Sequence, residues 1–288
     1  MRLRAMAKIN LGLDVVRKRE DGYHDVRMVM QTIRMYDFQE MTPKENKGFF
    51  LTTNLPYVPT DERNLVFKAA KLLMDEFQVD NGVRIRLQKF IPVAAGMAGG
   101  SSDAAAALVG INQIFHLGLT YEELIKRGAA IGADVPYCIL RGTALAEGIG
   151  EQLTPLPPLP FCYILIGKPG ISVSTKTAYQ NLCLDAIEHH PDIDGMVEAV
   201  RNRNLDGVIQ RMENVFEPGI VQQYPVIGRI RQIMEDNGAE KAMMSGSGPT
   251  VFGVFKDRKK MKQAYEALRK SQLVRNVFAT QVFQARRR

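Results

Sequence analysis

The segment from Pro92 to Asp103 constrains this chain more than any other. Its sequence, PVAAGMAGGSSD, holds three glycines and three alanines, and an alanine-rich stretch expected to be helical from Asp103 to about His116 follows directly. Small side chains allow a ligand to approach the backbone closely, and the N–H groups at a helix N-terminus attract anions. The segment therefore predicts a phosphate-binding loop that opens into a helix. From composition alone, a tight strand-to-helix turn capped by serine is an equally good interpretation.

The common nucleotide-binding signatures are missing from the sequence. No Gly-Lys-Ser/Thr closes the loop, as it would in a Walker A motif. The HRD and DFG signatures of protein kinases do not occur, and Val251 stands where a Rossmann fingerprint beginning at Gly246 would place its third glycine. A phosphate-binding loop in this chain would belong to a less common class.

A proline-rich segment indicates two domains. Four of the seven residues from Thr154 to Pro160 are proline, a composition that excludes helix and is poorly suited to a strand. Such a segment is typical of a stiff connector. We therefore expect an N-terminal domain over residues 1–154 and a C-terminal domain over residues 161–288.

Hydrophobic patterns indicate an α+β fold in both halves. In the first half, alternation predicts a strand at Val83–Leu87, a one-sided apolar pattern predicts a helix over Asn64–Phe77, and Thr120 with Glu123 forms a capping box. In the second half, strands are expected near 161–166, 240–244, 250–255 and 274–283, with helices from Pro225 and from Arg258. This order, strand-helix-strand-strand-helix-strand, is the ferredoxin-like pattern.

Charge and cysteine content narrow the functional classes. The net charge is +7, but the basic residues are scattered apart from Arg286–Arg288, so no nucleic-acid partner is expected. Three cysteines without a CxxC pair fit a reducing compartment. The longest apolar run, Ala104–Ile111, is too short to span a membrane, and the N-terminus lacks a signal-peptide pattern. A cytoplasmic protein with no membrane partner is expected.

Three segments together resemble the GHMP kinase superfamily, which includes galactokinase, homoserine kinase and mevalonate kinase. Ala7–Leu13 is similar to the first family motif, Pro92–Ser102 to the second, and Ser245–Phe252 to the third, in family order along the chain. Within the superfamily, Asp21–His24, Gly132–Pro136 and Pro169–Thr175 are most similar to kinases whose acceptor carries a cytidine diphosphate group. The resemblance implies a ribosomal-protein-S5-like N-terminal domain, beside the ferredoxin-like C-terminal domain.

The resemblance also implies an ATP site and a catalytic pair. The second motif would bind ATP through Pro92, Val93, Ala94, Ala95, Gly96, Met97, Ala98, Gly99, Gly100, Ser101 and Ser102. Asp134 would take the proton of the acceptor hydroxyl, while Lys8 would neutralise charge beside it and Asn10 would support the same site. Without the resemblance, Asp134 is more typical of a helix cap and Lys8 of a surface lysine.

The resemblance also implies one group of residues at the cytidine end of the acceptor and another near the adenosine of ATP. Tyr23 and His24 would hold the cytosine ring, with Thr175 and Tyr179 on the cytidine side. Asn64 and Lys89 would lie near the adenosine of ATP. Ala94 and Ala98 stand where many members carry glycine, and we expect their methyl groups to be tolerated, although alanine reaches positive φ less easily than glycine. Gly99 is expected to face the triphosphate, so that Gly99→Val would block it.

The resemblance predicts an ATP- and Mg²⁺-dependent phosphotransferase. Its small-molecule acceptor would be cytidine diphosphate methylerythritol, phosphorylated on the 2-hydroxyl in the non-mevalonate isoprenoid pathway. The alternatives are a homoserine or mevalonate type of GHMP kinase, or a non-catalytic nucleotide- or RNA-binding protein on an S5-like scaffold. The sequence assigns no protein ligand to Mg²⁺ and leaves monomer and homodimer open.

Overall fold

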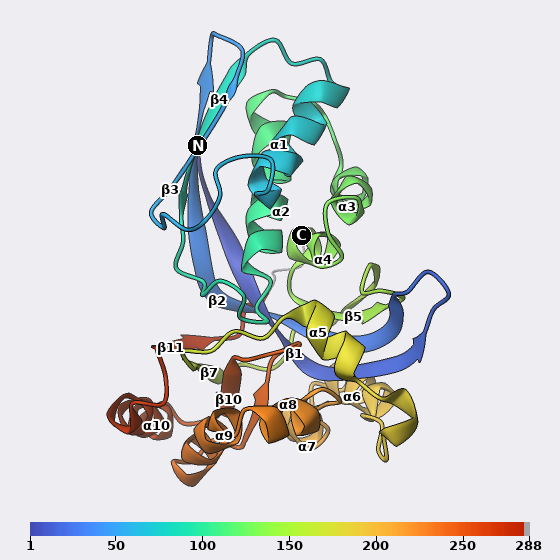
Figure 1. Cartoon of the computed structure of the whole chain (residues 1–288), viewed down its shortest axis with the longest axis vertical. Helices are drawn as coiled ribbons and strands as arrows, with labels where there is room; N and C mark the ends of the chain where they lie inside the picture. The colour runs from blue at the N-terminus through green and yellow to red at the C-terminus, as the bar shows by residue number, and fades with distance from the viewer. Residues whose placement is uncertain (285–288) are drawn as a thin grey trace. The chain divides into compact units, whose positions relative to one another are not determined.

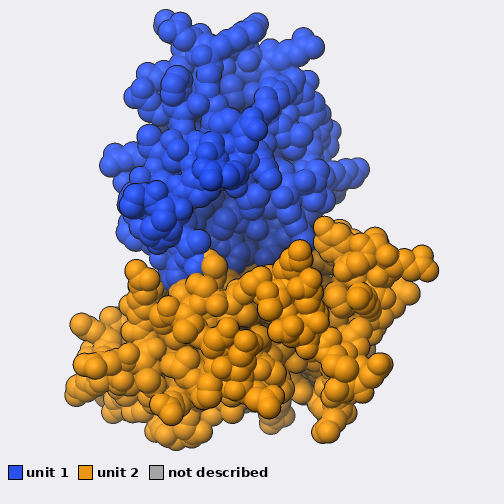
Figure 2. Space-filling view, viewed as in Figure 1, with its two compact units in different colours: residues 1–7, 35–93, 98–140 blue, residues 8–34, 94–97, 141–288 orange. Residues whose placement is uncertain are grey.

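The computed structural model describes residues 1–284, which divide into two compact units (Figures 1 and 2). Unit 1, blue in Figure 2, contains residues 1–7, 35–93 and 98–140. Unit 2, orange in Figure 2, contains residues 8–34, 94–97 and the described residues from 141 onward. Arg286–Arg288 lie outside the described residues.

Two long strands explain why these units do not follow a linear boundary at residue 154. Strands β1 (Arg2–Lys18) and β2 (His24–Lys44) each contribute residues to both units. Sequence patterns did not predict either strand. In β1 every residue from Ala7 to Val15 is buried, so neither face carries the regular polar positions that reveal a half-exposed strand.

Unit 1 packs helices against a sheet. Strand β4 pairs antiparallel with the second half of β2 and parallel with β3. The helices pack on one another in the pairs α1–α2, α2–α4 and α3–α4, and Figure 1 shows them on one side of these strands. The elements are β3 (Phe49–Thr53), α1 (Leu65–Glu76), β4 (Gly82–Gln88), α2 (Gly99–Ile114), α3 (Tyr121–Ala129) and α4 (Val135–Leu140).

Unit 2 contains a four-stranded antiparallel sheet in the order β11-β7-β10-β9. Helix α9 packs on β9 and β10, and α10 packs on β7 and β11. The strand-helix-strand-strand-helix-strand order expected for the C-terminal half is therefore confirmed. The elements are β7 (Tyr163–Lys168), α9 (Val226–Asp236), β9 (Lys241–Met244), β10 (Val251–Phe255), α10 (Arg258–Ser271) and β11 (Asn276–Gln281).

The other elements of unit 2 include strands of the seven-stranded sheet. Strand β5 pairs with β2 and with β6, and β8 pairs with β1 in parallel. These elements are β5 (Thr143–Glu147), β6 (Gln152–Leu156), α5 (Thr175–Asn181), a 3₁₀ turn (Leu184–Ala186), α6 (Ile193–Arg201), α7 (Leu205–Gln210), β8 (Glu213–Asn214) and α8 (Glu217–Gln223). No helix within residues 1–284 is long and apolar enough to cross a bilayer.

Two local expectations were wrong. Pro155 lies in a strand, opposite Ala144. Strand β6 tolerates this proline because, among residues 1–284, it pairs only with β5 and is therefore an edge strand. Helix α2 begins at Gly99 rather than at Asp103. Glycine has a low helix propensity, but a methyl group on Gly99 would lie only 3.0 Å from Ile91 Cγ2, so packing selects glycine in this first turn.

Candidate active site

Residues from all three motif segments meet in unit 2. The backbone N–H of Lys8 donates to the carbonyl oxygen of Met97 at 3.2 Å. The hydroxyl of Ser245 donates to the carbonyl oxygen of Gly96 at 3.0 Å. A methyl group built on Gly246 would lie 3.5 Å from Asn10 Oδ1. The first, second and third motifs, far apart in the sequence, therefore form one cluster.

Lys8 is a buried residue of β1 rather than a surface lysine. It is 5% exposed, and its Nζ donates to Asn10 Oδ1 at 2.8 Å. Asn10 is also fully buried, and its Nδ2 contacts the sulfur of Met28 at 3.3 Å. A buried ammonium needs polar partners, and the neighbouring asparagine supplies one.

The turn after β9 is held rigidly beside the loop. Asn214 donates through Nδ2 to the carbonyl oxygens of Met244 and Gly246, both at 2.8 Å. The peptide bond between Gly248 and Pro249 is cis. Asn214 is buried and belongs to no recognised motif, so its part in fixing this turn was not predicted from the sequence.

The glycine-rich loop contains two alanines in the left-handed region. Ala94 has a φ of 51° and Ala98 a φ of 52°. Alanine in this conformation costs roughly 1–2 kcal/mol. Both alanines therefore adopt the conformation that glycine reaches more easily, and the expectation that ATP binding tolerates their methyl groups stays a prediction.

The first turn of α2 presents a helix N-terminus with two serines of different accessibility. Ser102 is buried, and its hydroxyl donates to the carbonyl oxygen of Met6 and contacts the sulfur of Cys138. Ser101 is half-buried, and no hydrogen bond from another described residue engages its hydroxyl. Of the two hydroxyls, only that of Ser101 remains available to a phosphate oxygen or to Mg²⁺.

Asp134 precedes α4 in unit 1. It is half-buried, and its carbonyl oxygen accepts a hydrogen bond from the N–H of Cys138 at 3.0 Å. The residue therefore begins the helix through its backbone. Lys8, the other residue expected to be catalytic, belongs to unit 2.

His24 packs against an aromatic pair, Tyr179 and Phe216, through the ring of Tyr179 in unit 2. The rings of His24 and Tyr179 have centroids 5.1 Å apart, and Tyr179 packs edge-on against Phe216 at 4.8 Å. Partial burial, and then the Lys18 cation, lower the pKa of His24, so its imidazole is mainly neutral at pH 7. Tyr23 is 60% exposed. The sequence had no signal for Phe216, because no motif contains it.

Thr175 connects α5 to the turn of the third motif. Its Oγ1 lies 2.9 Å from Ser247 Oγ in a hydrogen bond. Thr175 and Tyr179 both belong to α5, four residues apart and so on one helix face. The structure thus joins Thr175, Tyr179 and His24 to the third motif within unit 2.

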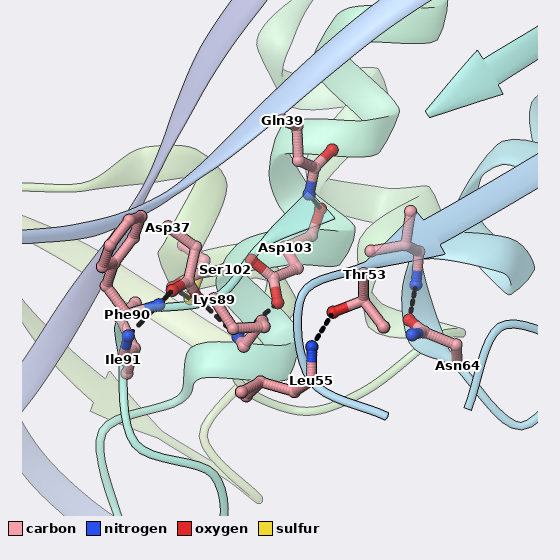
Figure 3. A network of polar contacts seen from close by, with 12 residues as sticks. Asp37, Gln39, Thr53, Leu55, Asn64, Lys89, Phe90, Ile91, Ser102 and Asp103 are labelled. Atoms are coloured by element: carbon pink, nitrogen blue, oxygen red, sulfur yellow. Dashed lines mark hydrogen bonds and ion pairs between the residues drawn. The ribbon is translucent and has the colours of Figure 1, made fainter. Parts of the chain in front are cut away.

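Asn64 and Lys89 have structural partners in unit 1 (Figure 3). Asn64 caps α1: its Oδ1 accepts from Val66 N at 2.9 Å and its Nδ2 donates to Pro59 O at 2.7 Å. The Nζ of Lys89 lies between the carboxylates of Asp37 and Asp103. Burial disfavours the lysine charge, but the two carboxylates outweigh this and raise the pKa of Lys89.

The sequence matches profiles of one kinase family in both halves. The GHMP kinases N terminal domain matches residues 64–142, and the GHMP kinases C terminal domain matches residues 196–273. The 4-diphosphocytidyl-2-C-methyl-D-erythritol kinase of Lachnospira eligens is 53% identical, with 98% of each chain covered. The enzyme of that name from Lachnoclostridium phytofermentans is 51% identical, with coverage of 99% of this chain and 98% of the relative.

Solved structures agree with this relationship. A crystal structure of 4-(cytidine 5'-diphospho)-2C-methyl-D-erythritol kinase superposes with a TM-score of 0.84 at 31% identity, covering 98% of this chain and 99% of that one. A homoserine kinase from Cytophaga hutchinsonii, at 18% identity and a TM-score of 0.75 over 97% of this chain and 95% of its own, shares the fold. The chain belongs to the GHMP kinase family, and its fold is the two-domain α+β fold of that family.

Proposed function

We propose that this chain is an ATP-dependent kinase that phosphorylates the 2-hydroxyl of 4-diphosphocytidyl-2-C-methyl-D-erythritol in the non-mevalonate isoprenoid pathway. The observation that carries the proposal is the cluster in unit 2, where Lys8 and Asn10, the loop carbonyls of Gly96 and Met97, and the Ser245–Gly248 turn meet. Full-length relatives with this activity in their names support the choice of acceptor. The products are ADP and the 2-phosphate.

ATP binds along residues 92–102. Backbone N–H groups in the first turn of α2 receive phosphate oxygens, as helix N-termini commonly do. Mg²⁺ would supply positive charge that neutralises the charge developing on the phosphates during transfer, and the Ser101 hydroxyl would help to hold it. Ser101 fits a place beside this charge because its hydroxyl has no partner among the described residues, whereas the Ser102 hydroxyl is engaged.

Asp134 and Lys8 act on the acceptor hydroxyl. Asp134 accepts the hydroxyl proton as the γ-phosphoryl group is transferred directly and in line. The Lys8 ammonium stabilises negative charge on the attacking oxygen. Asn10 holds the ammonium through the hydrogen bond at 2.8 Å.

The cytidine end of the acceptor is held by His24 and the aromatic residues beside it. A neutral imidazole carries one N–H donor and one nitrogen acceptor, which match the donor and acceptor edge of cytosine. Tyr23 supplies an exposed aromatic face, and Tyr179 and Thr175 complete the site from α5.

Phosphorus NMR tests the proposed reaction directly. The protein is incubated with ATP, Mg²⁺ and 4-diphosphocytidyl-2-C-methyl-D-erythritol, and the spectrum is followed for a new phosphomonoester resonance and for ADP. Parallel incubations contain homoserine or mevalonate. Turnover of either instead of the cytidine substrate would contradict the proposed acceptor, and binding of ATP without acceptor-dependent turnover would contradict a kinase.

His24→Ala is expected to raise the KM for the cytidine substrate about tenfold, with the KM for ATP unchanged. One lost hydrogen bond to a buried polar edge is worth roughly 1.5 kcal/mol, which corresponds to about tenfold in affinity. Steady-state kinetics with each substrate varied in turn measure both constants. His189→Ala, which removes an exposed histidine paired with Glu213, is the matched control. An unchanged cytidine KM, or a raised ATP KM, would refute base recognition by His24.

Gly100→Val is expected to weaken ATP binding at least tenfold while the protein stays folded. Gly100 is exposed, and a methyl group on it would contact only Leu65 Cδ1, at 3.8 Å. Valine therefore projects into open space at the helix N-terminus, and its helix propensity exceeds that of glycine. Calorimetric titration with ATP measures the affinity, and a thermal melt checks the fold.

Gly99 is not equivalent to Gly100, which corrects the expectation for Gly99→Val. A methyl group at Gly99 would point toward Ile91 and Lys89 rather than toward open space. Gly99→Val therefore perturbs packing and serves as the contrasting variant, expected to lower the melting temperature. Unchanged ATP affinity in a folded Gly100→Val variant would place the nucleotide elsewhere.

A further inference from the structure

A buried cluster of charges lies at the base of the loop in unit 1. The Lys89 ammonium is 2.5 Å from Asp103 Oδ2 and also bonds Asp37 Oδ2. The three side chains are only 4%, 0% and 3% exposed for Lys89, Asp37 and Asp103. Figure 3 shows the carboxylates converging on Lys89 from β2 and from α2. Burying three charged groups is costly, so the cluster calls for an explanation.

The cluster joins the two ends of the loop. Lys89 directly follows β4 and leads into the loop, whereas Asp103 lies in α2 at the end of the loop. The second oxygen of Asp37 accepts the backbone N–H groups of Phe90 and Ile91, the latter at 2.8 Å. Asp37 therefore fixes the segment that enters the loop, and Lys89 links that segment to the helix that leaves it.

The Lys89 ammonium also lies close to the first turn of α2. A methyl group on Gly99 would lie 3.3 Å from Lys89 Nζ, so the backbone of this first turn packs close to the charged group. A helix N-terminus carries partial positive charge and disfavours a bare cation. The carboxylates of Asp37 and Asp103 offset that repulsion and retain Lys89 in place.

Two buried polar atoms at this cluster have no hydrogen-bond partner among the described residues. Gln39 Nε2 donates to the carbonyl oxygen of Asp103 at 2.6 Å, yet Gln39 Oε1 and Asp103 Oδ1 are buried without a hydrogen-bond partner. Such atoms each cost free energy, and well-packed apolar residues are often as stable or more stable in such positions. Burial raises the pKa of Asp103 well above its usual range, although the Lys89 ammonium opposes this shift. Stability alone gives no clear reason for burying these charged groups.

We propose that Asp37, Lys89 and Asp103 are positioning residues for the phosphate donor, holding the two ends of loop 92–102 together so that its backbone is preorganised for ATP. Lys89 then acts through the loop rather than by contact with the adenosine. This inference rests on the proposed function for its kinetic consequence. Its structural part, a loop ordered by the cluster, is independent of the substrate.

The test combines hydrogen exchange with kinetics on the full chain. Asp37→Asn keeps the size of the side chain but weakens the cluster, and Lys89→Met removes the ammonium at similar length. In both variants, amides of residues 92–102 are expected to exchange at least about tenfold faster without ligand. The KM for ATP is expected to rise at least about tenfold, while the KM for the cytidine substrate changes less than twofold.

Leu73→Ala is the matched control for lost stability. Leu73 is fully buried in α1, eight residues beyond Leu65, or about 12 Å along the helix. Measurements are made at a temperature where melts show every variant folded. The control is expected to be destabilised but to keep wild-type exchange at 92–102 and a wild-type ATP KM.

Three outcomes would overturn the proposal. Exchange of residues 92–102 in Asp37→Asn that matches Leu73→Ala would show that the cluster does not order the loop. A raised ATP KM in Lys89→Met alone would make Lys89 a direct ligand, because the fully buried Asp37 cannot touch ATP. Equal rises in both substrate KM values would indicate general structural damage. If the wild-type chain lacks kinase activity, the hydrogen-exchange comparison still tests whether the cluster orders the loop. If Lys89→Met does not fold, Asp37→Asn alone is sufficient for that test.

Discussion

Asp134→Asn is expected to lower kcat by about 10²–10⁴ while the KM for ATP stays close to that of the wild type. Asparagine matches aspartate in size and polarity but cannot accept a proton at neutral pH, and this range is typical for loss of a general base. The fold should be retained, because Asp134 starts α4 through its carbonyl oxygen, and asparagine is as good a residue at a helix start. Single-turnover kinetics with ATP and the cytidine acceptor measure the chemical step.

An aspartate with a purely structural role provides the control. Asp257 caps α10, where its carboxylate accepts the N–H groups of Lys259 and Lys260, and it has no place in the proposed chemistry. Asp257→Asn should leave kcat unchanged. If Asp134→Asn turned over as fast as Asp257→Asn, Asp134 would be a helix-start residue only.

The sequence predicted those parts of the fold that have a local cause. The capping box of Thr120 and Glu123 forms as expected, and Asn64 caps α1. The ferredoxin-like order also follows from local patterns, since α10 and the short strands around it each show their own periodicity. Local signals of this kind need no knowledge of distant partners.

Long-range partners explain what the sequence did not predict. Asp37 is 52 residues from Lys89 and belongs to no motif. One signal was available, because Asp37 and Gln39 lie between Met35 and Met41 on the same buried face of β2. A carboxylate on a buried face requires a buried partner. The identity of that partner depends on how β2, β4 and α2 pack, which no single segment specifies.

Composition predicted that loop 92–102 binds a ligand, but it did not show which positions of the loop require glycine. Ala94, Gly96 and Ala98 all have positive φ, although only one is glycine. The two alanines are accommodated, whereas a methyl group on Gly96 would lie 2.2 Å from the carbonyl oxygen of Ser245. The critical glycine is therefore defined by contact with the third motif rather than by backbone conformation.

Gly96→Ala is accordingly expected to destabilise the protein by about 3 kcal/mol or more, and to weaken ATP binding. The left-handed conformation contributes about 1–2 kcal/mol, and relief of the overlap with Ser245 must shift backbone, which adds to that cost. A melting temperature lower by roughly 6–12 °C follows for a chain of this size, as measured by thermal unfolding.

Gly118→Ala separates the two contributions to this loss. Gly118 has a φ of +75°, close to the +67° of Gly96, but apart from its chain neighbours no described residue has an atom within 4 Å of a methyl group placed on it. It should therefore lose only the conformational part, about 1–2 kcal/mol. Equal losses in the two variants would mean that the contact between Gly96 and Ser245 does not constrain the loop. A larger loss at Gly96, accompanied by weaker ATP binding in calorimetry, would mean that the third motif shapes the nucleotide site through this backbone contact.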